Sequence, residues 1–418
     1  MKELRELYPT VEGDVIGNTA YSQRFVLKLL LKIANLETLQ EAITHETSFE
    51  DNLCVLWDMT TDKDVVLYLQ ENNALRLLQF ALPAVTVPRI MEIMIGIIGN
   101  MCCHAEVIEE LMQMETFLDN IVSYTQLFDT GILSEVFRLV GVCMYKANET
   151  HISIWLNIFK THNFSNALYF TLKNSSNKDL LLVTLEGLNT ICASVNNKNN
   201  VSNSFSTVLV TSEAVESLSS AFREIVVTQR EVCSDDEIER ICNITIQIIL
   251  YLASSSQSND VFSDSREEIA NIVLHTIDYY KSKYVEDKVI SDDLEDISEA
   301  VFLMTQRVKL CQLHCSKFVT IIYDFWKILH EKNKAEEDKS SWDAIEESKD
   351  VGSIIKFLGK TICYYIEKSS EYNLHKLLDI IVKDLDDIVS SIQDESVKDL
   401  IEIRTSGYVS RIKENNDS

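Results

Sequence analysis

The chain has 418 residues, of which 46% are hydrophobic, and it contains only three prolines and ten glycines. This composition can fill a large core but has few turn-forming residues for a sheet protein, so we expect an all-α fold. A formal net charge of −27 argues against binding to nucleic acid or to an anionic membrane surface, because both depend on Lys and Arg side chains.

The chain starts with a charged lead, residues 1–17, which we expect to be flexible. The lead has no apolar signal core, so we do not expect secretion. Thr19 or Ser22 can cap a first helix over residues 25–36. The polar stretch 37–52 then separates this helix from the next apolar segment.

Residues 53–103 have the pattern of three helices. A short apolar helix carries Trp57, an amphipathic helix covers about 64–82, and a third covers about 88–103 and is apolar on nearly every side. A helix that is apolar all round must be covered by other helices. This segment therefore indicates a stacked helical architecture.

The three-helix pattern repeats at a spacing of 42 residues. Ile98 and Gly99 recur as Val140 and Gly141, and a third copy at a spacing of about 46 places Gly187 at the position of Gly141. Periods in the forties are typical of armadillo and HEAT arrays, in which each unit buries its apolar face only by stacking on its neighbours. We therefore predict an armadillo/HEAT-like α-solenoid of stacked helical repeats.

The sequence divides this array into parts of different regularity. We expect regular armadillo-like repeats over residues 18–195 and irregular helical repeats over 196–329. A charged, weakly patterned stretch follows, and we expect it to be an exposed excursion over 330–350. Carboxy-terminal helices over 351–413 and a tail over 414–418 complete the chain.

Three blocks in the first quarter of the chain resemble a known family. They are GDVIGNTAYSQ at 13–23, NLCVLWDMTTDKDVVLYLQENNA at 52–74 and VPRIMEIMIGIIGNMCCHAEV at 87–107. These blocks resemble the serum amyloid A-like protein one family, which looks armadillo-like and does not look like serum amyloid A itself. The resemblance implies a non-enzymatic, largely nuclear protein linked to cell proliferation, and it supplies no catalytic residue.

One cluster has the residue types of a metal site. Cys311, His314 and Cys315 lie on one face of a helix, since residues three and four apart are neighbours. Zinc needs a fourth ligand, and only the distant His330 and Cys363 offer one. We therefore expect no metal, and we interpret the scattered cysteines as reduced thiols of a nuclear or cytoplasmic protein.

The sequence has no motif of a common enzyme class. There is no glycine-rich phosphate loop, no Gly-x-Ser-x-Gly elbow and no dinucleotide or kinase fingerprint. A catalytic pair that meets only in the fold is the remaining enzymatic alternative. We expect no enzyme activity and no cofactor.

Three residues are candidates for contact with another protein. Asn100 stands where the armadillo unit commonly presents an Asn into its concave groove, and an amide can both donate to and accept from a peptide backbone. Val142 and Leu188 replace it in the aligned copies, which argues against a long extended-peptide groove. Either a neighbouring helix or a ligand must satisfy the Asn100 amide, and we expect the ligand.

Trp57 and the adjacent acidic Asp58 are the other two candidates. The alternative role of Trp57 is a core-packing indole.

The acidity of the chain favours a basic partner, because an acidic field steers basic segments toward it. The alternative is that acidity only keeps the chain soluble. We expect an armadillo-like scaffold or adaptor that binds another protein, through a basic segment, in nucleus or cytosol. A transport-type adaptor that carries a basic cargo protein is the alternative function, and the oligomeric state stays open.

Overall fold

The computed structural model of the chain confirms the all-α prediction. It describes residues 13–196, 202–255, 262–310, 316–337, 342–390, 392 and 394–416. Across these ranges there is no strand, and β pairing is limited to an isolated antiparallel bridge between Val15 and Ser22. The chain forms two compact units, Met1–Val208 and Leu209–Ser418.

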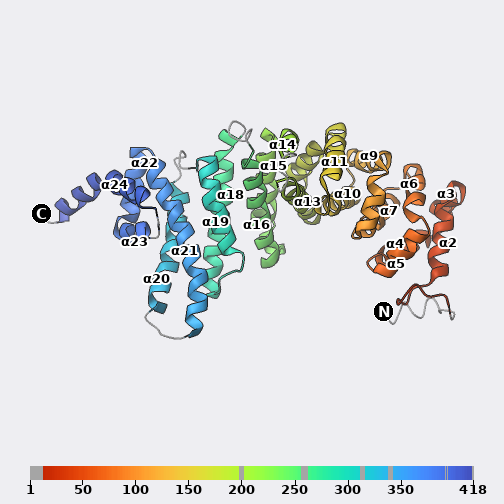
Figure 1. The fold of residues 1–418 in the computed structure, drawn as a ribbon, viewed down its shortest axis with the longest axis horizontal. Coiled ribbons are helices and arrows are strands. Elements are labelled where there is room, and N and C mark those ends of the chain that lie inside the picture. The colour runs from red at the N-terminus through yellow and green to blue at the C-terminus, as the bar shows by residue number, and fades with distance from the viewer. Residues whose placement is uncertain are drawn as a thin grey trace. The chain divides into compact units, whose positions relative to one another are not determined.

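Unit 1 is built from three-helix repeats of the armadillo kind (Figure 1). Its third helices stack in a row, with α4 on α7, α7 on α10 and α10 on α13. The triplets are α2 (Gln23–Ile33), α3 (Leu36–His45) and α4 (Phe49–Met59); α5 (Lys63–Glu71), α6 (Ala74–Ala81) and α7 (Pro88–Met101); α8 (Ala105–Met112), α9 (Glu115–Ser123) and α10 (Thr130–Tyr145); and α11 (Glu149–His162), α12 (Phe164–Asn174) and α13 (Lys178–Asn196). The helix α14 (Ser202–Leu209) follows them.

The 42-residue spacing is visible in the packing of the third helices. A methyl group at Gly141 of α10 would lie 3.5 Å from the Cα atom of Gly187 in α13, so the two backbones touch where the sequence aligned these glycines. A larger side chain at either position would push the helices apart. Buried residues of α4 recur in α7 at the same spacing, namely Leu53, Leu56 and Met59 as Ile95, Ile98 and Met101.

Two expectations about the helices of unit 1 were wrong. The stretch 37–52 contains α3, which buries Leu39 and Ala42, so the Trp57 helix is the third helix of one repeat and not the first of the next. The amphipathic segment 64–82 is two helices, α5 and α6, separated at Asn73. Asn73 has a φ of 55°, in the left-handed region that short polar side chains tolerate, and this turns the chain between them.

Residues 13–17 are the described part of the expected flexible lead, and several of them contact neighbouring helices. Ile16 is buried. Asp14 accepts hydrogen bonds from Ser22 Oγ (2.6 Å) and from the Arg24 backbone N–H (2.7 Å) at the start of α2. Ser22 is the N-cap of α2, as one of the two predicted candidates. Gly17 has a φ of 50° and lies against Asp64, where a side chain would overlap the carboxylate.

Unit 2 is built from helix pairs, the HEAT-like pattern. The helices α16, α19 and α21 form one row, and α15, α18, α20 and α22 form the other. The helices are α15 (Ser212–Arg223), α16 (Asp235–Ala253), α18 (Arg266–Asp287), α19 (Leu294–Val308), α20 (Ser316–Glu337), α21 (Trp342–Lys368), α22 (Glu371–Ile381), α23 (Leu385–Ser390) and α24 (Glu395–Asn416).

The described parts of the segment 330–350, which we expected to be an exposed excursion, are helical. α20 continues to Glu337, and α21 begins at Trp342. The His330 ring stacks on Trp326, with 4.6 Å between ring centroids, and its Nε2 lies 3.4 Å from the Asp387 carboxylate. His330, at the start of this segment, therefore contacts α23.

Within the described ranges, no single helix has the length and apolar composition needed to cross a bilayer. α7 and α8 reach that limit only when taken together, and they are bent by 120° relative to each other.

Candidate protein-binding face

Side chains of α4 and α7 in unit 1 form a mixed acidic and aromatic surface, which we call the Trp57 face. The helices α4 and α7 pack against each other, and each contributes residues at helical spacing on its solvent side. Asp58 is exposed, and the other members are exposed or half-buried. The Trp57 face consists of Glu50, Cys54, Trp57 and Asp58 on α4, and Arg89 and Glu92 on α7.

Trp57 packs against α7 and is only half-buried, and its contact with a partner stays a prediction. Its half-buried indole lies across α7 against Gly96, where any side chain would overlap the ring. Gly96 is required for this close approach because it has no Cβ. The Arg89 guanidinium carbon lies 5.9 Å from the centroid of the same ring, a cation–π distance. The indole is thus held by packing while it contributes to the surface.

Arg89 occupies the centre of the Trp57 face. Its Nη1 donates to Glu92 Oε1 at 2.6 Å, its Nε lies 3.5 Å from Glu50 Oε1, and its Nη2 lies 3.6 Å from Cys54 Sγ. The hydrogen bond to Glu92 raises the pKa of Arg89 above its ordinary value. The aromatic and acidic groups of the Trp57 face are therefore already in contact with one cation, the Arg89 guanidinium.

Asn100 is half-buried next to the Trp57 face, and neighbouring helices satisfy its amide. Its Nδ2 donates to the Trp57 carbonyl (3.2 Å) and to Thr60 Oγ1 (3.0 Å), and its Oδ1 accepts from Arg138 Nη1 (2.9 Å). Both amide hydrogens are therefore used within the chain. These contacts favour a structural role for Asn100, and the expected direct contact with a partner stays a prediction.

Arg138 of α10 links this network to the next repeat. Its Nη2 donates to the Gly96 carbonyl at 3.0 Å, and its Nε donates to Glu135 at 2.8 Å. The guanidinium fills the space beside Gly99. Burial raises the pKa of Glu135, and Arg138 partly offsets that effect.

Sequence reasoning missed Arg89, Glu92 and Arg138. One signal was present, since a charged pair three residues apart interrupts the otherwise apolar helix α7. A second signal was that Arg138 aligns with Gly96 at the 42-residue spacing, so a long side chain in one repeat corresponds to a residue without a side chain in the repeat before it.

Cys311, His314 and Cys315, the cluster with the residue types of a metal site, lie outside the described residues. In the part that the structure describes, no group of three metal-ligating side chains converges. Of the two distant candidates, His330 pairs with Asp387, and Cys363 is buried, which raises its pKa to about 12.

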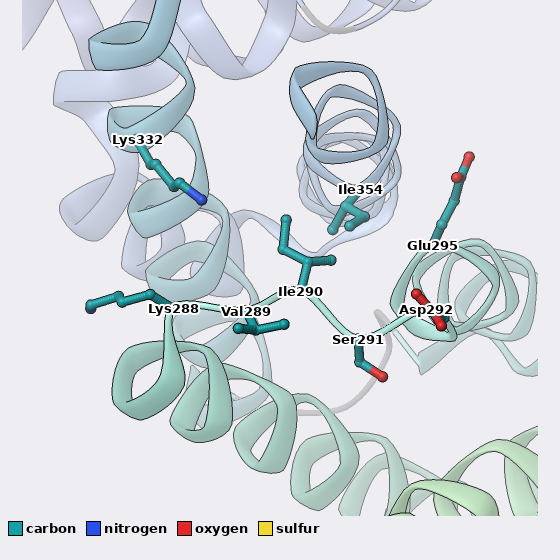
Figure 2. Close-up of a pocket in the computed structure, with 8 residues that line it drawn as sticks. All are labelled: Lys288, Val289, Ile290, Ser291, Asp292, Glu295, Lys332 and Ile354. Carbon is teal, nitrogen blue, oxygen red and sulfur yellow. The ribbon is translucent and has the colours of Figure 1, made fainter. Parts of the chain in front are cut away.

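Unit 2 contains a cavity of about 330 Å³ at the turn between α18 and α19 (Figure 2). Two lysines and two acidic residues contribute opposite charges to its wall, and none of the residues predicted from the sequence lines it. The Nζ atoms of Lys288 and Lys332 lie 5.9 Å and 5.4 Å from the ring centroid of Tyr284. The lining residues are Lys288, Val289, Ile290, Ser291, Asp292, Glu295, Lys332 and Ile354.

Relatives of known name support the resemblance carried by the three sequence blocks. The chain resembles Protein SAAL1. It is 31% identical to the human protein over 181 residues, which are 41% of this chain and 38% of the relative. It is also 31% identical to the zebrafish protein over 184 residues, or 42% and 39% of the two chains. The matched region thus spans about two fifths of the length of these curated relatives.

Two further comparisons add little. No family model matches the chain. Among solved structures, an engineered protein aligns with a TM-score of 0.44 and 10% identity over 92% of this chain and 93% of its own.

Proposed function

We propose that the protein is a non-enzymatic interaction scaffold or adaptor that binds a basic segment of another protein on the Trp57 face. A helical repeat array and the resemblance to SAAL1 proteins support a scaffold. The observation that carries the proposed location is the seated Arg89 guanidinium, because it shows that this surface accommodates a cation. We also propose a nuclear location, on the resemblance alone.

The chemistry of the face fits a basic partner. The Trp57 ring provides a cation–π surface, and the carboxylates of Glu50 and Glu92 lie beside it. The exposed Asp58 adds a third carboxylate, on α4 next to Trp57. A partner's arginine or lysine would therefore find aromatic and anionic groups together. The transport-type adaptor is the special case in which the basic partner is a cargo that is released by another factor.

A binding measurement tests this proposal. The probe is a fluorescein-labelled eight-residue peptide of alternating Arg and Gly, titrated with the intact protein and followed by fluorescence anisotropy. Trp57→Ala should weaken binding about tenfold, since cation–π contacts with partial desolvation contribute on the order of 1–2 kcal/mol. The matched control is Phe80→Ala, which removes a 56% exposed aromatic residue from α6.

Circular dichroism should show that both variants remain folded. Equal affinity of Trp57→Ala and the unmodified protein would contradict the proposed location. Absence of peptide binding to the unmodified protein would contradict the basic-partner hypothesis.

A further inference from the structure

The Trp57 face already has the groups that bind a cation, namely an aromatic ring and two carboxylates, and the bound cation comes from the chain itself. A guanidinium lies over an aromatic ring between two carboxylates that come from different helices. The ring is held close to α7 because Gly96 has no side chain to overlap it. The site is therefore preorganised, and its occupant is the chain's own Arg89.

Arg138 of α10, which lies next to the Trp57 face, shows how Arg89 differs from a structural arginine. The Arg138 side chain is 29% exposed, its Glu135 partner is 13% exposed, and it donates to the Gly96 carbonyl and to the Asn100 amide. Arg89 is 43% exposed, and Glu50 is 50% exposed. Arg89 therefore stands at the rim, where solvent reaches both members of its longer ion pair.

The contacts of Arg89 are also easier to exchange. Its close hydrogen bond is to Glu92, three residues along the same helix, while the contact with Glu50 on α4 is 3.5 Å long. Exposed ion pairs of this kind contribute little to stability. Loss of the contact with Glu50 would leave the α4–α7 packing intact, since buried apolar residues of both helices make that interface.

We propose that Arg89 is an internal substitute for a basic side chain of the partner. On binding, an arginine or lysine of the partner takes the place on the Trp57 ring between Glu50 and Glu92, and the Arg89 side chain moves into solvent. This inference rests on the proposed function and specifies its subsite. Without a partner, Arg89 occupies the subsite. A basic residue of the partner must therefore compete with Arg89 for the Trp57 ring and the two carboxylates.

Competition predicts that removal of Arg89 strengthens binding. Arg89→Gln leaves Glu50 and Glu92 without their cation, so the labelled Arg-Gly peptide should bind about tenfold more tightly than to the unmodified protein. Arg89 also carries a positive charge, and its loss makes the whole surface more acidic. The control is Arg76→Gln on α6, which removes the same charge from a side chain that is 70% exposed and 3.9 Å from Glu110. This control should change affinity less than about twofold.

A third variant separates the subsite from general electrostatics. In the double variant with Arg89→Gln and Glu92→Gln, the gain should disappear because one carboxylate of the subsite is gone. Melting temperatures measured for each variant show that the comparison is between folded proteins.

The outcomes of the anisotropy titration are distinct. Tighter binding by Arg89→Gln but not by Arg76→Gln supports the internal substitute. If the unmodified protein binds the peptide and Arg89→Gln binds it equally or more weakly, the internal substitute is wrong and the scaffold proposal stands. Equal gains from both Arg variants would also overturn it, since bulk charge would then explain the effect. Failure of every variant to bind overturns both proposals.

Discussion

At the scale of single residues, the polar groups around Asn100 hold three successive third helices together. Its amide joins the end of α4 to α7, and Arg138 joins α7 to α10. Asn100→Ala removes these hydrogen bonds and leaves half-buried partners unsatisfied, so we expect the free energy of unfolding to fall by about 1–2 kcal/mol. Urea unfolding measures this change.

The control for this prediction is Asn166→Ala, at an exposed position of α12, which should stay within about 0.5 kcal/mol of the unmodified protein. Because the amide hydrogens of Asn100 are used internally, Asn100→Ala should retain peptide affinity per folded molecule. An unchanged stability together with a tenfold loss of affinity would restore the ligand-binding role expected from the sequence.

Part of the candidate site follows from the sequence, and part does not. The Asn100 amide lies beside Trp57, as the 42-residue repeat allows, and Asp58 is adjacent to Trp57 in the chain. The role of Asn100 could not be predicted, because it depends on Arg138, which is 38 residues away and reaches back across a glycine. Side-chain pairing between repeats is a tertiary property that no local pattern contains.

At the scale of helices, α20 and α23 are joined by a row of charges. Lys334 Nζ lies 2.8 Å from Asp387 Oδ2, and this hydrogen bond lowers the pKa of Asp387 below its ordinary value. A carboxyl whose folded pKa is below its unfolded value stabilises the fold above the unfolded pKa, about 3.9. That contribution is lost as the pH falls through the lower, folded pKa.

We therefore expect Asp387→Asn to lower the stability of the protein at pH 7 and to make its loss below about pH 4 less steep. Asp386→Asn, a change at the neighbouring exposed carboxylate, is the matched control and should leave the acid limb unchanged. The measurement is urea unfolding between pH 7 and pH 2.5. Parallel acid profiles for Asp387→Asn and the unmodified protein would show that the pair does not stabilise the fold.

Helix existence followed from periodicity, whereas helix boundaries followed from single residues. The apolar third helices were predictable because the same apolar positions recur in successive repeat units, 42 residues apart. α3 was missed because only Leu39 and Ala42 are buried among polar residues. The break between α5 and α6 depends on the left-handed backbone conformation of Asn73, which the residue pattern alone does not specify. The charged residues 330–337 gave no indication that His330 would pack on Trp326.

At the scale of the whole molecule, charge and architecture support different parts of the proposed function. The stacked repeats of unit 1 provide a helical surface, and the Trp57 face is one specific position on it. The net charge of −27 acts over longer distances and does not choose a position. Charge should therefore govern how fast a basic partner arrives, and the contacts of the face should govern how long it stays.

This division predicts how salt acts on binding. Raising the ionic strength shortens the Debye length, to about 8 Å at 0.15 M and about 3 Å at 1 M, so the acidic field reaches less far. In stopped-flow measurements with the labelled Arg-Gly peptide, we expect the association rate constant to fall about tenfold or more between 0.05 and 0.5 M salt. The Trp57→Ala variant keeps the net charge, so its association rate should show the same salt dependence while its dissociation is faster. An association rate that ignores salt would mean that the acidity of this chain serves solubility and not partner capture.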